Sequence, residues 1–299
     1  MSMNGKIIKL LSGVYTVTTS EGDILCTAKG GFRKQGISPV PGDCVEISVF
    51  SDGSGRIEKI LPRNNYLIRP NVSNVDALCY VSSYSKPTPF QYMIDKMLVI
   101  SQSVGIEPIL IFNKVDLDDE GDVQSLVDLY KSIGYSVFCV SAETGAGVES
   151  LRDALAKKTV IFAGNTGVGK SSIINKLFPD LCLKTGEISD KLGRGRHTTR
   201  HIELFPMGDG YLADTPGFGT LELDGYSIES TKLETCFPEF NPYLSDCCYL
   251  NCAHINEKDC GVRKAVENRS ISAGRYESYR QMYHNLKESE TPWSKKKSN

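Results

Sequence analysis

The 299-residue sequence predicts an α/β protein in three parts: a small N-terminal β-barrel, a central α/β domain and a C-terminal helical module. Closely spaced strand-like runs with glycine turns fill the first part. In the second part apolar runs alternate with helical patterns, which is typical of a buried parallel sheet. Five cysteines crowd into one segment of the third part. We place the divisions at residues 1–69, 70–225 and 226–299.

The composition is that of an ordinary globular protein. Hydrophobic residues make up 40% and charged residues 23% of the chain, as in most soluble proteins. No run approaches the roughly 20 apolar residues of a membrane span, and the N-terminal residues lack the apolar core of a signal peptide. We therefore expect a cytoplasmic protein.

The N-terminal part contains four predicted strands, at residues 14–19, 23–28, 44–50 and 56–61. An OB-fold is the commonest small barrel of this length, although an SH3-like barrel would give a similar pattern.

Both ends of the chain carry a net positive charge: residues 1–70 carry +3 and residues 261–299 carry +5, while the middle of the chain is acidic. Basic ends suit contact with a polyanion such as RNA, but solvated surface charge explains them equally well.

The central part is expected to have strands at residues 77–83, 108–114, 135–142 and 159–164, with helices at residues 89–105, 121–133 and 148–156. Apolar residues of the first helix recur at helical spacing. They are Phe90, Met93, Ile94, Met97 and Leu98. Such a stripe predicts burial in the core of the protein.

A glycine-rich segment follows the strand at residues 159–164 and fits the pattern G-x-x-x-x-G-K-S. It consists of Gly164, Asn165, Thr166, Gly167, Val168, Gly169, Lys170, Ser171 and Ser172. The glycines let backbone N–H groups wrap around phosphates at the positive end of the following helix. We expect Lys170 to reach the β- and γ-phosphates and the Ser171 hydroxyl to ligate Mg²⁺.

A second motif, Asn113, Lys114, Val115 and Asp116, follows the strand at residues 108–114. The carboxylate of Asp116 can accept hydrogen bonds from guanine N1 and N2, which adenine cannot offer. The pair Ser141-Ala142 ends the next strand and would support guanine O6 through a backbone N–H. The alternative is that this motif is only a polar turn after a buried strand, with no role in binding a base.

Further residues complete a nucleotide site. Thr199 is the expected second Mg²⁺ ligand, with Thr198 as its rival, Asp214 would hold Mg²⁺ through water, and the Gly217 N–H would sense the γ-phosphate. These motifs predict a GTP-hydrolysing domain. Since the guanine motif precedes the phosphate loop, which is the reverse of the usual order, the sequence predicts a circularly permuted P-loop GTPase domain.

Two mechanistic expectations follow from this arrangement. No glutamine follows the Asp214–Gly217 motif to orient the attacking water, so His197 is the best candidate for that role, although a surface histidine without a catalytic part is nearly as good an explanation. The Asp214–Gly217 motif also runs directly into the C-terminal module. Departure of the γ-phosphate is therefore predicted to reorient that module.

The cysteine cluster predicts one structural zinc site. Cys247, Cys252, His254 and Cys260 supply three thiolates and an imidazole, which matches a closed tetrahedral Cys₃His site. Cys248 could replace Cys247, but we treat it as a bystander. Disulfides are the alternative, and they are uncommon in a cytosolic protein.

As a whole, the chain resembles the bacterial ribosome small subunit-dependent GTPase A (RsgA) family. The resemblance rests on VPGD ending at Asp43, TGEIS at residues 185–189, GRHTTR at residues 195–200, FPEF at residues 237–240 and the motifs above. It implies binding to the 30S ribosomal subunit late in its maturation and GTP hydrolysis that the subunit stimulates. It also implies a catalytic role for His197 and contacts of the basic ends with 16S rRNA. We expect the protein to be a monomer.

Two rival functions remain open from the sequence. One is a permuted GTPase of another type, acting on a different RNA or on a protein. The other is an RNA-binding scaffold that binds the nucleotide without hydrolysing it.

Overall fold

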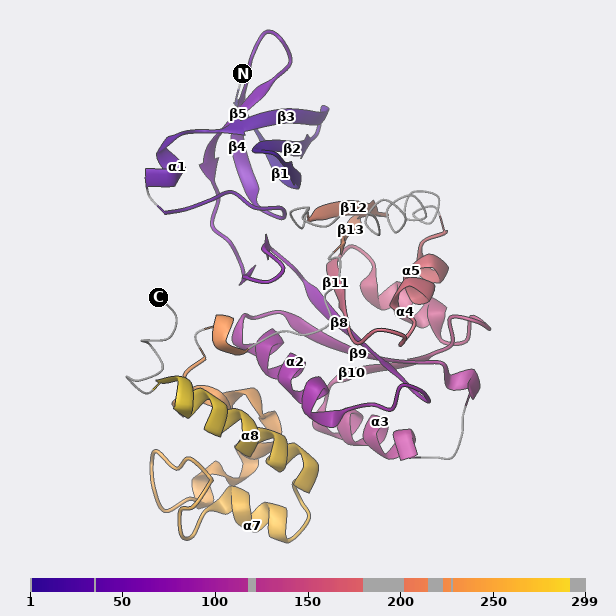
Figure 1. Ribbon diagram of the computed structural model, residues 1–299, viewed down its shortest axis with the longest axis vertical. Coiled ribbons are helices and arrows are strands. Elements are labelled where there is room, and N and C mark those ends of the chain that lie inside the picture. The colour runs from indigo at the N-terminus through magenta and orange to yellow at the C-terminus, as the bar shows by residue number, and fades with distance from the viewer. Residues whose placement is uncertain are drawn as a thin grey trace.

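The computed structural model describes residues 2–34, 36–117, 122–179, 202–214, 223–226 and 228–290. Figure 1 shows the three parts along the long axis of the molecule: the barrel at one end, the α/β domain in the middle and the helical module at the other end. Within the described residues, no helix has the length and the apolar character that crossing a membrane requires.

The N-terminal barrel has five strands: β1 (Ser2–Leu11), β2 (Val14–Thr19), β3 (Gly22–Ala28), β4 (Cys44–Val49) and β5 (Gly55–Ile60). A short helix, α1 (Gly31–Lys34), follows β3. The strand order is β1-β2-β3-β5-β4, and a β1–β4 ladder closes the barrel. Within the described residues of the barrel, only the β3–β5 ladder is parallel. This five-stranded topology confirms the OB-fold.

Strand β1 was not predicted from the sequence, and it contains Asn4-Gly5, a dipeptide that is typical of turns. In the structure Gly5 lies inside the strand, where a Cβ atom would collide with Val17 of the neighbouring strand β2. Here the glycine permits the close approach of two strands instead of a reversal of the chain.

The central sheet continues with β8 (Ala77–Ser83), β9 (Glu107–Asn113), β10 (Ser136–Val140), β11 (Thr159–Ala163), β12 (Glu203–Met207) and β13 (Gly210–Asp214). Their order is β10-β9-β8-β11-β13-β12, and all ladders are parallel except that between β12 and β13. The helices are α2 (Gln91–Ser103), α3 (Asp122–Ile133), α4 (Val148–Leu155) and α5 (Lys170–Leu177). Side chains of α2 and α3 belong to one hydrophobic cluster and those of α4 and α5 to another. The sheet therefore has a helical layer on each face (Figure 1).

The stripe on α2 is largely buried, as predicted. Ile94, Met97 and Leu98 are in the core and Met93 is half-buried. The prediction was wrong for Phe90, which is 61% exposed. Phe90 precedes the helix and has an extended backbone, so its side chain does not follow the helical periodicity.

The barrel and the central domain share one sheet. Strand β1 pairs with β12 through Lys9 and Glu203, whose side chains form a 2.8 Å ion pair. A second link comes from Lys6, whose ammonium donates to the Thr159 hydroxyl at 3.0 Å and lies 4.8 Å from the centre of the Tyr211 ring. The side chains of the Lys9–Glu203 pair are about one third exposed (36% and 32%).

The segment after the barrel is anchored by the buried carboxylate of Asp43, at the end of the VPGD sequence. It accepts hydrogen bonds from Arg63 at 2.6 and 2.8 Å and from the Ser73 hydroxyl at 2.6 Å. Ser73 belongs to a small hairpin, β6 (Tyr66–Leu67) and β7 (Val72–Ser73), that leads to β8. Asp43 thus fixes the path by which the chain leaves the barrel.

The turn η2 (Leu223–Gly225) leads into the C-terminal module. The module contains the 3₁₀ turns η3 (Ser230–Cys236) and η4 (Pro238–Asp246) and the helices α7 (Gly261–Glu267) and α8 (Ala273–Glu290). Helix α8 packs on α2. The apolar side chains of the module join the cluster that contains α2 and α3; they include Leu233, Phe237, Phe240, Tyr279, Met282 and Leu286. Among its described residues, the module therefore has no apolar core separate from this cluster.

A buried ion network fixes the module on the central domain. Arg275 of α8 is fully buried and donates to Asp95 of α2 at 2.7 Å and to Glu239 of η4 at 2.7 and 3.1 Å. Its guanidinium lies 4.5 Å from the centre of the Phe237 ring. The Tyr130 hydroxyl of α3 also donates to Asp95, at 2.5 Å. Phe237 and Glu239 come from the FPEF sequence, so the structure gives that sequence an architectural role.

Candidate nucleotide site and metal centre

The guanine motif and the phosphate loop meet at one edge of the sheet. Strands β9 and β11 both pair with β8 in parallel, and the two motifs follow the carboxyl ends of β9 and β11. In open α/β sheets this edge is where ligands bind. The motifs are about fifty residues apart in sequence, yet the strand order places them on either side of β8.

Asn113 joins three segments of the site. Its side chain is buried, with 2% of the residue exposed. The Nδ2 group donates to the Val168 carbonyl at 2.9 Å, and Oδ1 accepts from the Ala142 N–H at 3.1 Å. One amide side chain therefore holds together the end of β9, the phosphate loop and the Ser141-Ala142 turn.

Lys114 adds a second connection, since its ammonium donates to the Gly167 carbonyl at 2.8 Å and to the Lys86 carbonyl at 2.7 Å. The sequence does not indicate a role for the loop that contains Lys86. It contributes a backbone carbonyl, which a search for functional side chains cannot detect. Val115 and Asp116 follow in a short turn, η1 (Val115–Leu117), where Asp116 is exposed at the surface.

The glycines of the phosphate loop have specific steric roles. Gly164 has φ +137° and packs so closely on β8 that a Cβ would collide with the Val81 carbonyl. Gly169 has φ +91°, and a Cβ there would collide with Nδ2 of Asn113. The second of these glycines thus makes room for the side chain that joins the two motifs.

Lys170 is the first residue of α5, and Ser171 and Ser172 are exposed in the first turn of that helix. The Lys170 ammonium donates to the carbonyls of Gly164 and Asn165, at 2.6 and 2.8 Å. Burial lowers the pKa of this lysine from its usual value. An anionic phosphate beside the ammonium would oppose that shift.

The rest of the predicted nucleotide site is only partly within the described structure. His197, Thr198, Thr199 and Gly217 lie outside the described residues. Asp214 is the last residue of β13, and its backbone pairs in register with Glu203 of β12.

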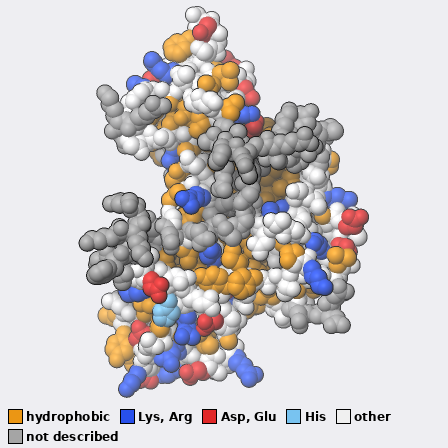
Figure 2. Space-filling view, viewed as in Figure 1, with side chains coloured by type: hydrophobic (Ala, Val, Ile, Leu, Met, Phe, Trp, Pro, Cys, Tyr) orange, Lys and Arg blue, Asp and Glu red, His pale blue; other side chains and the backbone are white. Residues whose placement is uncertain are grey.

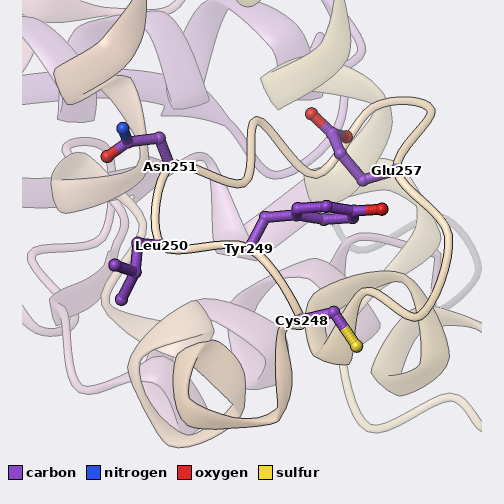
Figure 3. Close-up of a pocket in the computed structure, with 5 residues that line it drawn as sticks. All are labelled: Cys248, Tyr249, Leu250, Asn251 and Glu257. Carbon is purple, nitrogen blue, oxygen red and sulfur yellow. The ribbon is translucent and has the colours of Figure 1, made fainter.

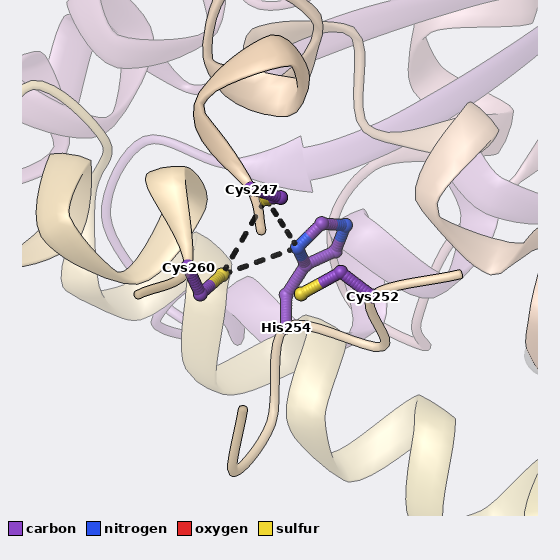
Figure 4. Close-up of side chains that lie close together, drawn as sticks. All are labelled: Cys247, Cys252, His254 and Cys260. Atoms are coloured by element: carbon purple, nitrogen blue, oxygen red, sulfur yellow. Dashed lines mark hydrogen bonds between the residues drawn. The ribbon is translucent and has the colours of Figure 1, made fainter. Parts of the chain in front are cut away.

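The four predicted metal ligands lie together in the C-terminal module (Figure 4), with all ligand atoms within 4.8 Å of one another. The His254 Nδ1 atom lies 3.6 Å from Cys247 Sγ and 3.3 Å from Cys260 Sγ, and the two sulfurs are 3.9 Å apart. Ligand atoms around a tetrahedral zinc ion are expected about 3.5–3.8 Å apart, given metal–ligand bonds of about 2.0–2.3 Å. The four residues therefore fit a metal ion of this kind.

Backbone groups around the cluster also suit a metal–thiolate site. The N–H of Gly261 points at Cys247 Sγ at 3.3 Å, and the N–H of Arg263 points at Cys260 Sγ at 3.5 Å. Such donors stabilise thiolates. Burial raises the pKa of Cys252 to about 12, an effect that a bound cation would reverse.

Cys248 lies outside this group. It is exposed and lines an open hollow with Tyr249, Leu250, Asn251 and Glu257 (Figure 3). Cys236, the remaining cysteine of the C-terminal cluster, is the buried last residue of η3 and is not one of the four residues.

Comparisons with known proteins agree with this architecture. The RsgA GTPase family model matches residues 60–224, and the RsgA N-terminal domain model matches residues 4–57. A protein of Caldanaerobacter subterraneus subsp. tengcongensis named "Small ribosomal subunit biogenesis GTPase RsgA" is 43% identical over 289 residues, covering 96% of this chain and 97% of that protein. A relative of the same name from a Geobacillus species is 45% identical over 288 residues, covering 95% and 97% of the two chains.

Two solved structures share the whole fold. The crystal structure of YjeQ from Thermotoga maritima has a TM-score of 0.82 and 37% identity, covering 96% of this chain and 99% of that one. YloQ, described as a circularly permuted GTPase, has a TM-score of 0.80 and 33% identity, with 97% of each chain covered. The reversed order of the motifs therefore reflects a circular permutation of the GTPase domain. This chain is a GTP-hydrolysing member of the RsgA GTPase family.

Proposed function

We propose that this GTPase binds the 30S ribosomal subunit late in its maturation, hydrolyses GTP to GDP and phosphate there, and is stimulated by the subunit. The names of the relatives supply the link to the small subunit. The observation that supports the chemistry best is the pair of hydrogen bonds made by Asn113, because they hold the guanine motif against the phosphate loop.

The described residues suggest how GTP would be held. Asp116 would accept from guanine N1 and N2, and the backbone of residues 164–169 would surround the phosphates. Lys170 would exchange its two carbonyl acceptors for phosphate oxygens, and Ser171 would ligate Mg²⁺. The Ala142 N–H already donates to Asn113, so guanine O6 would share this donor with the asparagine.

For hydrolysis we assign roles to residues outside the described part of the chain on the basis of sequence alone. Thr199 would complete the Mg²⁺ coordination, Gly217 would contact the γ-phosphate, and His197 would orient the attacking water. Asp214, at the end of β13, would hold Mg²⁺ through a water molecule. Slow intrinsic turnover is expected, because no glutamine follows this motif to position the water.

We also propose that the metal in the C-terminal module is zinc with a structural role. Three sulfurs and one imidazole nitrogen are typical zinc ligands, and four protein ligands leave no coordination position for a substrate. Metal binding would stabilise a segment in which Tyr249 and Leu250 are exposed to solvent.

The partner surface is proposed to lie on both ends of the molecule, which would contact 16S rRNA. Figure 2 shows Lys and Arg side chains at the end formed by the C-terminal module, mixed with acidic ones. A monomer that works in the cytoplasm, where ribosomal subunits mature, fits this role.

The decisive experiment is GTP turnover by the purified protein with 30S subunits, with 50S subunits and with neither. We expect acceleration by 30S subunits only, and we expect the Lys170→Ala variant to remain slow in all three reactions. Equal rates with and without 30S subunits would contradict the proposed stimulation. Equal acceleration by both subunits would instead indicate a general RNA effect.

A further inference from the structure

The imidazole of His254 has two different partners. Its Nδ1 atom faces the sulfurs of Cys247 and Cys260. On the opposite side of the ring, Nε2 lies 2.6 Å from a carboxylate oxygen of Glu234. The histidine side chain is 2% exposed, so this hydrogen bond is shielded from water, whereas the Glu234 side chain is 31% exposed.

These partners determine where the proton of the neutral imidazole resides. An ionised carboxylate only accepts hydrogen bonds, so the proton must be on Nε2. The lone pair of Nδ1 is then free and directed at the two sulfurs. A histidine that ligates a metal requires this tautomer.

We propose that Glu234 is a positioning residue of the metal centre, which holds His254 in the tautomer and ring orientation that bind the metal. This inference rests on the metal site of the proposed function and adds a fifth residue to it. The sequence gives no sign of the role, because Glu234 is twenty residues before His254 and belongs to no metal-binding motif.

The position of Glu234 in the chain gives this contact a second consequence. Glu234 belongs to η3, which comes shortly after the segment that starts at Asp214. The same turn is held to α8 by Ser230, whose N–H and hydroxyl donate to Glu290 at 2.6 and 2.8 Å. The metal centre therefore helps to fix the point where the chain enters the C-terminal module.

The test compares zinc release from the full-length, zinc-loaded protein and its variants into a chromophoric chelator. Loss of such a partner usually lowers metal affinity about 10–100-fold, so we expect Glu234→Ala to release zinc faster than wild type by about this factor. Glu234→Gln keeps an acceptor but loses the charge, so its rate should be intermediate. Glu229→Ala is the matched control, because Glu229 adjoins the same turn and its side chain forms an exposed ion pair with Lys232.

The possible outcomes separate this inference from the proposed function. If wild type holds zinc and both Glu234 variants release it at the wild-type rate, Glu234 has no positioning role although the metal site stands. If wild type holds no zinc, the metal site and this inference both fail. Should Glu234→Ala not fold, the rate for Glu234→Gln decides the question alone.

Hydrogen exchange gives a readout that does not depend on zinc release. Removing zinc from wild type should increase exchange at residues 230–236. The zinc-loaded Glu234→Ala variant should already exchange faster there, whereas zinc-loaded Glu229→Ala should match wild type. Unchanged exchange at these residues in Glu234→Ala would overturn the proposed link between the metal and η3.

Discussion

Asn113 shows how one side chain can assemble a site from distant parts of the chain. Its two hydrogen bonds span 55 and 29 residues of sequence. The sequence predicted the residue and its place after a buried strand, but its bonding partners depend on the strand order. The role of Gly169 was likewise predicted only in part. We expected it to let the backbone wrap around phosphates, and the structure shows that it also makes room for Asn113.

Replacing Asn113 by alanine should weaken GTP binding about 10–100-fold. The substitution leaves the Ala142 N–H and the Val168 carbonyl without their partner, and each buried hydrogen bond contributes about 1–3 kcal/mol when its loss leaves a group unsatisfied. Titration with a fluorescent GTP analogue measures the effect. Asn251→Ala, on the exposed metal loop, is the control, and wild-type affinity of Asn113→Ala would contradict the bridging role.

Asp116→Asn should change the base preference of the site from guanine to xanthine. An asparagine amide cannot accept both guanine donors, but it can donate to the carbonyl that xanthine has at the same position. We expect GTP affinity to fall by about 100-fold or more and XTP to bind better than GTP. Competition binding with both nucleotides gives the answer, and an unchanged preference for GTP would show that Asp116 does not contact the base.

Among the secondary-structure elements, those of the central domain were predicted well because apolar runs and helical spacing are local properties. Contacts between elements were not predicted. Arg275 meets Asp95 across 180 residues, and nothing in α8 alone distinguishes this arginine from Arg280 nearby. Strand β1 was missed for a related reason, since the role of Gly5 depends on a neighbouring strand.

The two arginines of α8 provide a matched pair of variants. Arg275→Met should lower the free energy of unfolding by about 3–5 kcal/mol, because it leaves Asp95 buried without a counter-charge. Arg280→Met removes only an ion pair with Glu277 whose side chains are 43% and 51% exposed, so it should cost about 0–1 kcal/mol. Urea unfolding followed by circular dichroism measures both, and equal losses would contradict the role of the buried network.

At the level of the whole molecule, the barrel and the C-terminal module are attached very differently. The module is held by fully buried charges. The barrel meets β12 at the Lys9–Glu203 pair, and Glu203 in turn pairs with Asp214 on β13. Cross-strand pairing through Lys9, Glu203 and Asp214 thus connects the barrel to the motif that is expected to sense the γ-phosphate.

This contrast bears on the prediction that nucleotide state reorients the module, which stays untested. The contacts favour the barrel as the part that moves. Spectroscopic labels on exposed Leu25, Glu149 and Lys264, introduced as non-natural amino acids because the chain has ten cysteines, would measure both distances from the central domain. Between GDP and a GTP analogue we expect the Leu25–Glu149 distance to change and the Glu149–Lys264 distance to stay constant. The opposite result would favour a moving module.

The position of Arg275 also determines whether the central domain is stable without the C-terminal module. A shortened chain that stops near residue 226 would expose to water the face of α2 on which α8 packs, and it would remove Arg275 from Asp95. We therefore expect the central domain and the module to melt in a single calorimetric transition, and the shortened chain to aggregate. A truncation of the gene that keeps every nucleotide-binding motif would therefore still leave no folded, active enzyme.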